Sequence, residues 1–206
     1  MKPLKQFGYT KERESLISTT YKTLPKDKSN SYGFTLIELL VAVIVAGVLL
    51  AIGVPSYQQF IQKNHTITQT NNLVSALNLA RSEAIKRGVQ VTVRRKGTTS
   101  QEWDSGWDIF SDLNADGTLT DDGDANLCET GEDCLLRTYG ALPNGYTLRT
   151  GANYDDWVAY LPSGLSRSSS GTANDTFRVC ANNADTTKSR AVAVSVSGRP
   201  RTSTGT

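Results

Sequence analysis

The sequence predicts an α+β protein in which one long N-terminal helix packs on a small antiparallel β domain. Three observations support this fold class: an uninterrupted apolar run near the N-terminus, a following stretch with apolar side chains at helical spacing, and short β-branched runs over the rest of the chain. With 206 residues, 38% of them hydrophobic, the chain can build one or two small domains with a modest core.

The first 33 residues form a polar segment without helical or strand periodicity. Seven Lys/Arg against three Asp/Glu give this segment a net charge of +4, which leaves −2 for the remainder of the chain. Positive charge before an apolar segment keeps that side of a membrane cytoplasmic. We therefore expect residues 1–33 to stay in the cytoplasm and the C-terminal part to be exported.

Residues 34–54 form an apolar run of 21 residues, roughly 30 Å long as a helix, which matches the hydrocarbon thickness of a bilayer. Its only ionisable side chain is Glu38. A carboxylate at membrane depth costs roughly 2.5–3.5 kcal/mol, so this residue needs a partner or a function. On topology alone, a plain signal anchor with an N-terminal tail remains an alternative.

Residues 55–88 continue as an amphipathic half-helix. Pro55 removes one helical hydrogen bond, so we expect a kink there. The apolar side chains that follow recur at helical spacing, and Lys86, Arg87 and Gly88 supply a basic last turn and a left-handed cap. The two halves together predict one long kinked helix, with its first half transmembrane and its second half packed on a globular head.

Residues 89–206 form the predicted head. Seven short runs alternate or are rich in β-branched residues, and Gly, Pro, Asn, Asp and Ser separate them. The runs read "VQVTVRR", "GWDIFSD", "LLRTYG", "YTLRTG", "WVAYLP", "TFRVCAN" and "RAVAVSVSG". This pattern predicts antiparallel strands, whereas we expect residues 163–175 to be a flexible loop.

Charge and motif content argue against several function classes. Between Gln101 and Asp133 there are eleven acidic residues and no basic one, so the chain is not a uniformly basic nucleic-acid binder and any basic site must be local. The only histidine, His65, has no cysteine or carboxylate in helical register. Because no phosphate-binding glycine loop, zinc spacing or nucleophile elbow occurs either, we do not expect an enzyme.

The junction "GFTLIELL", which begins at Gly33, resembles the processing site of type IV pilins and type II secretion pseudopilins. The resemblance implies that a prepilin peptidase cuts between Gly33 and Phe34, that Phe34 becomes N-methylated, and that assembly depends on Glu38. Physical chemistry agrees with this interpretation. The cut leaves a cationic amine at the membrane face, and a carboxylate one helical turn along can pair with the amine of a neighbouring subunit in low dielectric.

Further stretches resemble the minor pilins and pseudopilins of the GspH/FimT/FimU type: "LVSALNLARSEAIKRGVQVTV", "FSDLNADG", "FRVC" and the terminal "SVSGRPR". The resemblance implies the type IV pilin fold and a minor subunit that helps to initiate or cap a type IV pilus. It also implies that the protein waits in the inner membrane and then joins other pilins or pseudopilins, at the filament tip. Two alternatives stay open, a DNA-binding minor pilin for natural transformation and a minor pseudopilin H of a type II secretion system.

The DNA-binding alternative rests on a Gly-Arg-x-Arg element of one branch of this family, which residues 198–201 match. Arg199 and Arg201 can each contact a phosphate bidentately, Gly198 allows close approach, and Lys188 and Arg190 would widen the patch. Binding to double-stranded DNA would then be weak, sequence-independent and salt-sensitive. The competing interpretation is an ordinary solvated strand end.

The stretch "DLNADGTLTDDGD" follows the start of a calcium-binding loop, with oxygen ligands at Asp112, Asn114 and Asp116. Gly123 stands where the bidentate glutamate of such a loop belongs, although Asp121, Asp122 or Asp124 can substitute for it. We favour an acidic loop held by Asx turns over a calcium site. Calcium remains the alternative interpretation of this loop, and it is the one cofactor that the sequence suggests.

Three cysteines allow one disulfide, which agrees with export. Cys128 and Cys134 flank a short acidic loop and are the expected pair. Cys180, on a predicted strand, would then be a small buried residue, and its pairing with either of the others remains open.

Overall fold

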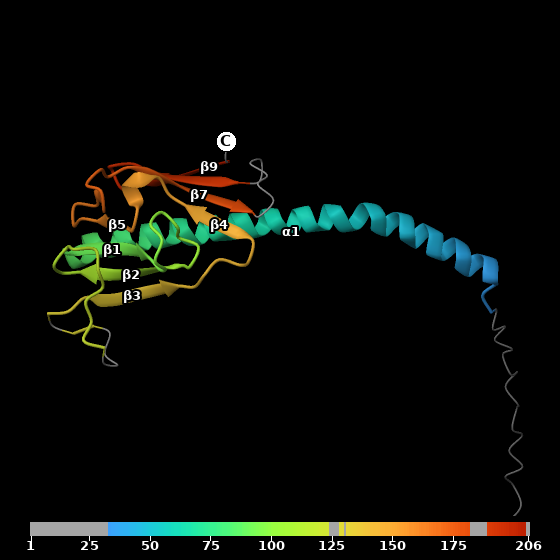
Figure 1. The fold of residues 1–206 in the computed structure, drawn as a ribbon, viewed down its shortest axis with the longest axis horizontal. Coiled ribbons are helices and arrows are strands. Elements are labelled where there is room, and N and C mark those ends of the chain that lie inside the picture. The colour runs from blue at the N-terminus through green and yellow to red at the C-terminus, as the bar shows by residue number, and fades with distance from the viewer. Residues whose placement is uncertain (1–32, 124–127, 130, 182–188, 205–206) are drawn as a thin grey trace, which may run out of the picture. The chain divides into compact units, whose positions relative to one another are not determined.

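The computed structural model describes residues 33–123, 128–129, 131–181 and 189–204, and the chain divides between Ala46 and Gly47 into two compact units (Figure 1). One helix, α1 (Leu36–Arg87), begins in the first unit and ends in the second. All strands of the described residues belong to the second unit.

The first half of α1, residues 36–54, exposes every side chain. By length and composition α1 can cross a membrane, and the apolar part that makes this possible is not buried. Nothing in the described part of the chain covers this apolar surface, which agrees with the apolar helix expected from the sequence.

The second half of α1, residues 55–87, carries one buried stripe. The stripe consists of Thr66, Thr70, Leu73, Ala76, Leu77, Ala80 and Ala84. Steps of three and four residues place these side chains on one helix face. The helix passes through Pro55 without interruption and ends where Gly88 adopts φ +71°, its N–H donating to the carbonyl of Ala84 at 3.0 Å. The helix expected here is confirmed, and the kink at Pro55 stays a prediction.

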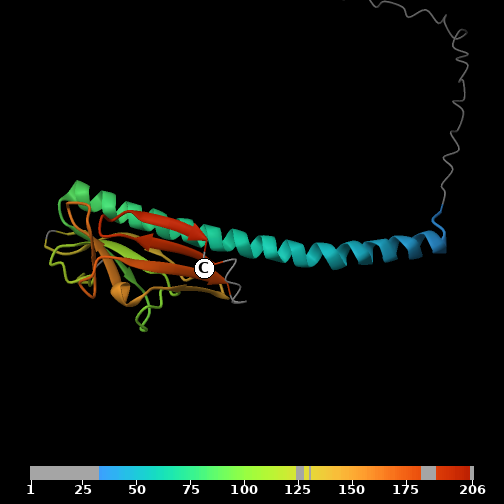
Figure 2. The ribbon, with the colours of Figure 1, turned by 90° about the horizontal axis from the view of Figure 1, so that it is seen from above.

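Two antiparallel sheets form the rest of the second unit, with strand orders β3-β2-β1-β5-β6 and β4-β7-β8-β9. In chain order the strands are β1 (Gln90–Arg95), β2 (Trp107–Asp112), β3 (Cys134–Tyr139), β4 (Tyr146–Arg149), β5 (Trp157–Tyr160), β6 (Ser166–Ser168), β7 (Asp175–Ala181), β8 (Arg190–Val194) and β9 (Pro200–Thr204). A 3-10 helix, η1 (Ala152–Tyr154), precedes β5. Both sheets lie alongside the C-terminal part of α1 (Figures 1 and 2).

One core joins the helix to both sheets. Leu73 and Leu77 of α1 are in the same buried cluster as Val91 of the first sheet and Phe177 of the second. Trp103, in the loop before β2, packs edge-on against Phe177, with ring centroids 5.0 Å apart. Full burial of side chains of this size contributes roughly 1.5–3 kcal/mol each, so the second half of α1 is part of the folded head.

All seven predicted runs contain a strand, but two further strands were not predicted. β6 lies inside the stretch expected to be a flexible loop, and that expectation is wrong for this segment. Ser166 and Ser168 are buried, and their hydroxyls donate to the carbonyls of Ala173 and Thr172. Polar serines can fill strand positions here because backbone carbonyls of the same loop accept their hydrogen bonds.

Candidate functional site

The first candidate site is the N-terminal end of α1. Phe34 is 85% exposed, and Glu38 is exposed in the first helical turn. Thr35 and Glu38 form a reciprocal capping box: the Thr35 Oγ1 accepts from the Glu38 N–H at 3.3 Å, and a Glu38 Oε2 accepts from the Thr35 N–H at 3.5 Å. Glu38 therefore has a role within its own chain that our sequence analysis missed, although the T-x-x-E spacing signals it.

This capping box holds a negative charge at the positive end of the helix dipole. Its carboxylate contact lies at the outer limit of a hydrogen bond, and the Glu38 side chain remains exposed. The carboxylate is thus oriented toward the start of the helix while still accessible to a stronger cationic donor.

The second candidate site is the turn between β8 and β9. Gly198 has φ +74°, and its N–H donates to the carbonyl of Ser195 at 2.8 Å. A Cβ at this position would overlap the carbonyl oxygen of Gly164 and stand 3.2 Å from the Nε of Arg81. Arg81 in turn donates from Nε to the same carbonyl at 2.9 Å. Gly198 is buried, so the turn itself, packed against α1, requires glycine here.

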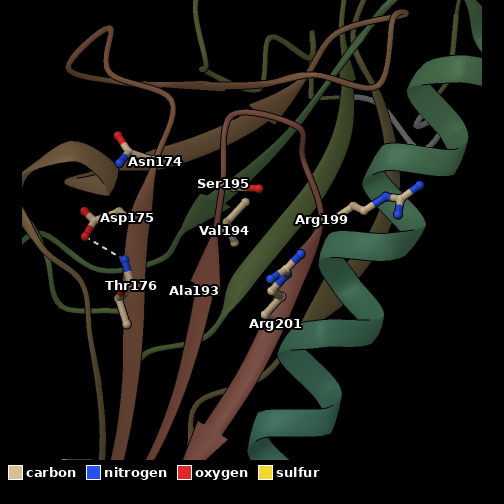
Figure 3. A pocket seen from close by; sticks show the side chains of 8 residues that line it. All are labelled: Asn174, Asp175, Thr176, Ala193, Val194, Ser195, Arg199 and Arg201. Atoms are coloured by element: carbon tan, nitrogen blue, oxygen red, sulfur yellow. Dashed lines mark hydrogen bonds between the residues drawn. The ribbon is translucent and has the colours of Figure 1, made fainter.

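Arg199 and Arg201 line a groove of about 430 Å³ on the second sheet, together with residues of β7 and β8 (Figure 3). Both side chains are exposed, and neither forms an ion pair with any described residue. In Figure 3, Arg199 extends from the turn toward α1, whereas Arg201 stands on β9. The pair offers two free guanidinium groups beside the hydroxyl and amide groups of Thr176, Ser195 and Asn174.

The one acidic side chain in the groove is already occupied. The Asp175 carboxylate accepts the backbone N–H groups of Gly151 at 3.2 Å, Asn153 at 3.0 Å, Tyr154 at 3.0 Å and Thr176 at 2.7 Å. Three of these groups belong to the N-terminal turn of η1, where a carboxylate is favoured. Asp175 therefore serves the fold and leaves the two arginines uncompensated.

The wider patch expected around these arginines is only partly tested. Lys188 lies outside the described residues. Arg190 is half-buried and lies two residues before the buried Val192, so both side chains are on the same face of β8. Ala193, the cross-strand neighbour of Arg201, is on the other face. Because side chains alternate along a strand, the structure does not bring Arg190 and Arg201 together.

Asp112 organises the acidic loop after β2. It is buried, and its carboxylate accepts hydrogen bonds from Thr92 Oγ1 at 2.6 Å, Gln90 Nε2 at 2.9 Å and the N–H of Gly117 at 2.9 Å. Asn114 and Asp116 close Asx turns, since their side-chain oxygens accept the N–H groups of Asp116 at 3.1 Å and Thr118 at 2.6 Å. These contacts are those of the Asx-turn interpretation, and calcium binding stays a prediction.

Asp121 and Asp122, two of the substitute ligands considered for calcium, lie close to each other and to Glu132. One oxygen from each of Asp121, Asp122 and Glu132 lies within 4.8 Å of the others. Partial burial, with repulsion from Asp122, raises the pKa of Glu132. The third substitute, Asp124, lies outside the described residues.

A disulfide joins Cys128 and Cys134, the pairing expected from their separation. It ties the acidic segment to the first residue of β3. Cys180 is a free, half-buried thiol on β7.

Comparison with known proteins finds two family models that match this chain. The family model for the type II transport protein GspH matches residues 69–198, and the model for the prokaryotic N-terminal methylation motif matches residues 28–54. The crystal structure of the type IV minor pilin FimU from Pseudomonas aeruginosa has a TM-score of 0.53 and 19% identity, over 70% of this chain and 92% of that one. At this identity the likeness shows the fold.

Curated relatives are type IV pilins. The type IV major alpha-pilin of Moraxella bovis is 36% identical over 70 residues, which are 34% of this chain and 43% of the relative. The type IV major fimbrial protein FimA of Dichelobacter nodosus is 31% identical over 115 residues, which are 54% of this chain and 64% of the relative. The chain thus spans less than two thirds of either relative. Since the GspH model matches more than half of the chain, the protein belongs to the GspH family of type IV minor pilins and pseudopilins and carries their N-terminal methylation motif.

Proposed function

We propose that this protein is a minor pilin that is cut between Gly33 and Phe34 and helps to initiate or cap a type IV pilus through Glu38. The observation that supports this most is the first half of α1, an exposed apolar helix whose only ionisable side chain is Glu38. Such a surface has to be covered by a membrane or by neighbouring subunits.

In this mechanism the cut creates a cationic amine on Phe34 of each subunit. The Thr35–Glu38 capping box keeps the carboxylate near the start of its own helix, where the amine of a neighbour arrives. An unpaired carboxylate in hydrocarbon is unfavourable, so docking that supplies the amine is favoured over docking that does not. The weak contact with Thr35 gives way to a charge-assisted hydrogen bond.

Two variants separate assembly from helix capping. Glu38→Ala should insert and be processed but be absent from sheared filaments. Thr35→Val removes only the capping hydroxyl and should enter filaments at the wild-type level. Immunoblots of membrane and filament fractions measure both, and wild-type incorporation of Glu38→Ala would overturn the proposal.

The type II secretion alternative draws support from the description of the matching family model. The two systems differ in phenotype rather than in subunit chemistry. Deletion of the gene should abolish twitching if the protein serves a pilus, whereas loss of exoprotein release with intact twitching would place it in a secretion pseudopilus instead.

We propose DNA binding as a second function of the same scaffold. It is favoured by one specific observation: Arg199 and Arg201 are exposed, unpaired within the described chain, and line the same groove. Full-length protein in nonionic detergent should bind duplex DNA in a salt-sensitive way, and Arg199→Gln/Arg201→Gln should lose most of that binding. The matched control is Lys63→Gln/Arg137→Gln, which removes the same charge from exposed positions on α1 and β3.

A further inference from the structure

We propose that the solvent face of the sheet β4-β7-β8-β9 forms a platform for the phosphate backbone of duplex DNA, with Arg178 as a contact of its own. This inference rests on the DNA binding proposed above and extends it. We call the residues Arg178, Ala191, Ala193, Arg201 and Ser203 the arginine platform.

Strand register places the two arginines on one face. Arg178 of β7 pairs with Ala191 of β8, and Arg201 of β9 pairs with Ala193 of β8. The two alanines are two residues apart, so they and their cross-strand neighbours share a face. The intervening Val192 is buried on the other face. Neighbouring strands lie about 4.8 Å apart, which puts β7 and β9 roughly 10 Å from each other.

Arg178 carries a charge that the sheet does not neutralise. It is exposed, and its direct neighbour on β4 is Arg149, although like charges in that position destabilise a sheet. Arg149 is compensated, because Asp104 and Glu102 both pair with its guanidinium and hydrogen bonding by Asp104 raises its pKa. Arg178 has no acidic partner among the described residues, so a free cation remains on this face.

The composition of the face selects the kind of nucleic acid. Apart from the arginines, its described side chains on β7, β8 and β9 are threonine, alanine, serine and one half-buried cysteine. Small alanines on the central strand let a backbone approach closely, and none of these described side chains is an aromatic ring on which a base can stack. Single-strand binding depends on such stacking, whereas duplex binding depends on phosphate contacts. Of the acidic stretch, Glu102 and Asp104 pair with Arg149 on β4, and the loop after Asp112 connects β2 to β3 in the other sheet.

The test uses full-length protein in nonionic detergent and a labelled duplex of mixed sequence, titrated from low to physiological salt. Arg178→Gln should weaken binding several-fold and reduce the slope of log K against log salt by about 0.9, the value for one phosphate contact. Arg178→Lys should retain the slope. Arg137→Gln, an equal charge change on β3 of the other sheet, should leave it unchanged. A single strand of the same length should bind more weakly than the duplex.

The outcomes distinguish this inference from the function on which it rests. If Arg199→Gln/Arg201→Gln loses binding while Arg178→Gln matches Arg137→Gln, DNA binding stands and the platform is overturned. Tighter binding of the single strand would also overturn the platform. If the wild-type protein does not bind duplex at low salt, the DNA-binding function itself fails, and the platform with it.

Discussion

The two halves of α1 share one secondary structure and have opposite surroundings. Leu50 in the first half is 62% exposed, whereas Leu73 in the second half is fully buried. The sheets of the same chain cover one face of the second half from Thr66 onward, and nothing in the described part of the chain covers the first half. The second half is therefore a folding element, while the first half presents a surface that other molecules have to complete.

The largest expected effect tests this contrast directly. Leu73→Ala should lower the free energy of unfolding of the head by about 2–5 kcal/mol, because it leaves a cavity among the helix and both sheets. Leu50→Ala, the same substitution in the exposed half, should leave it unchanged. Guanidinium unfolding of full-length protein in detergent, followed by tryptophan fluorescence, measures both effects. Equal midpoints for the two variants would contradict the contrast between the two halves of α1.

The second effect concerns the turn that the second half of α1 supports. Gly198→Ala forces a side chain into a left-handed backbone and against Gly164, so it should destabilise the head by about 1–3 kcal/mol or more. It should also weaken DNA binding, because Arg199 follows this turn. Gly171→Ala is the control, since Gly171 has φ +87° but no atom within 4 Å of an added Cβ. Equal losses in the two variants would mean that packing against α1 contributes nothing.

The third expected effect is a loss of folding stability at alkaline pH. Burial raises the pKa of Tyr154 to about 12 and also raises the pKa of Tyr160. An unfolded tyrosine ionises near pH 10, so stability should be complete below pH 10 and fall between pH 10 and 12, by about 1.4 kcal/mol per pH unit for each buried phenol.

Tyr160→Phe tests whether the buried phenol of Tyr160 contributes to this alkaline loss of stability. The Tyr160 hydroxyl is buried without a hydrogen-bond partner among the described residues, so its removal should change stability little at pH 8. The variant should lose less stability than the wild type above pH 10. Urea unfolding at pH 8, 10 and 11 measures this, and identical pH profiles would count against burial as the cause.

The smallest effect is expected near the C-terminal end of α1. Glu83→Gln removes ion pairs with Arg87 at 2.6 Å and Lys86 at 3.6 Å, which should cost about 0.3–0.5 kcal/mol at neutral pH. The hydrogen bond from Arg87 lowers the pKa of Glu83, so this contribution is present above the ordinary glutamate pKa and disappears as the pH falls through the lowered value. Thermal unfolding at pH 7 and pH 3 should show a difference between variant and wild type only at pH 7.

The sequence predicted a helix or strand wherever apolar residues within that segment recur at helical spacing or alternate with polar ones. Helical spacing predicted the second half of α1, and alternation predicted seven strands. β6 and β9 were not predicted, because Ser166–Ser168 and Pro200–Thr204 contain no alternation of apolar and polar residues. Their strands exist because β5 and β8 supply a backbone to pair with, and no local pattern encodes that partner.

The sites divide in the same way. Glu38 stood out because it interrupts an apolar run, and a short spacing rule also encodes its contact with Thr35. The sharing of one face by Arg178 and Arg201 did not stand out. They lie in different strands, and only the register of β7, β8 and β9 aligns them.

By itself, the sequence determined the apolar helix with its single carboxylate, the amphipathic continuation and the alternating strands of the head, because these depend on neighbours within a few residues. Only the tertiary structure decided that the Asp112 carboxylate accepts hydrogen bonds from Gln90 and Thr92, that Gly198 is required by packing against the Gly164 carbonyl, and that Arg190 lies on the face opposite Arg201. These outcomes depend on contacts between residues far apart in the chain, which no local period specifies.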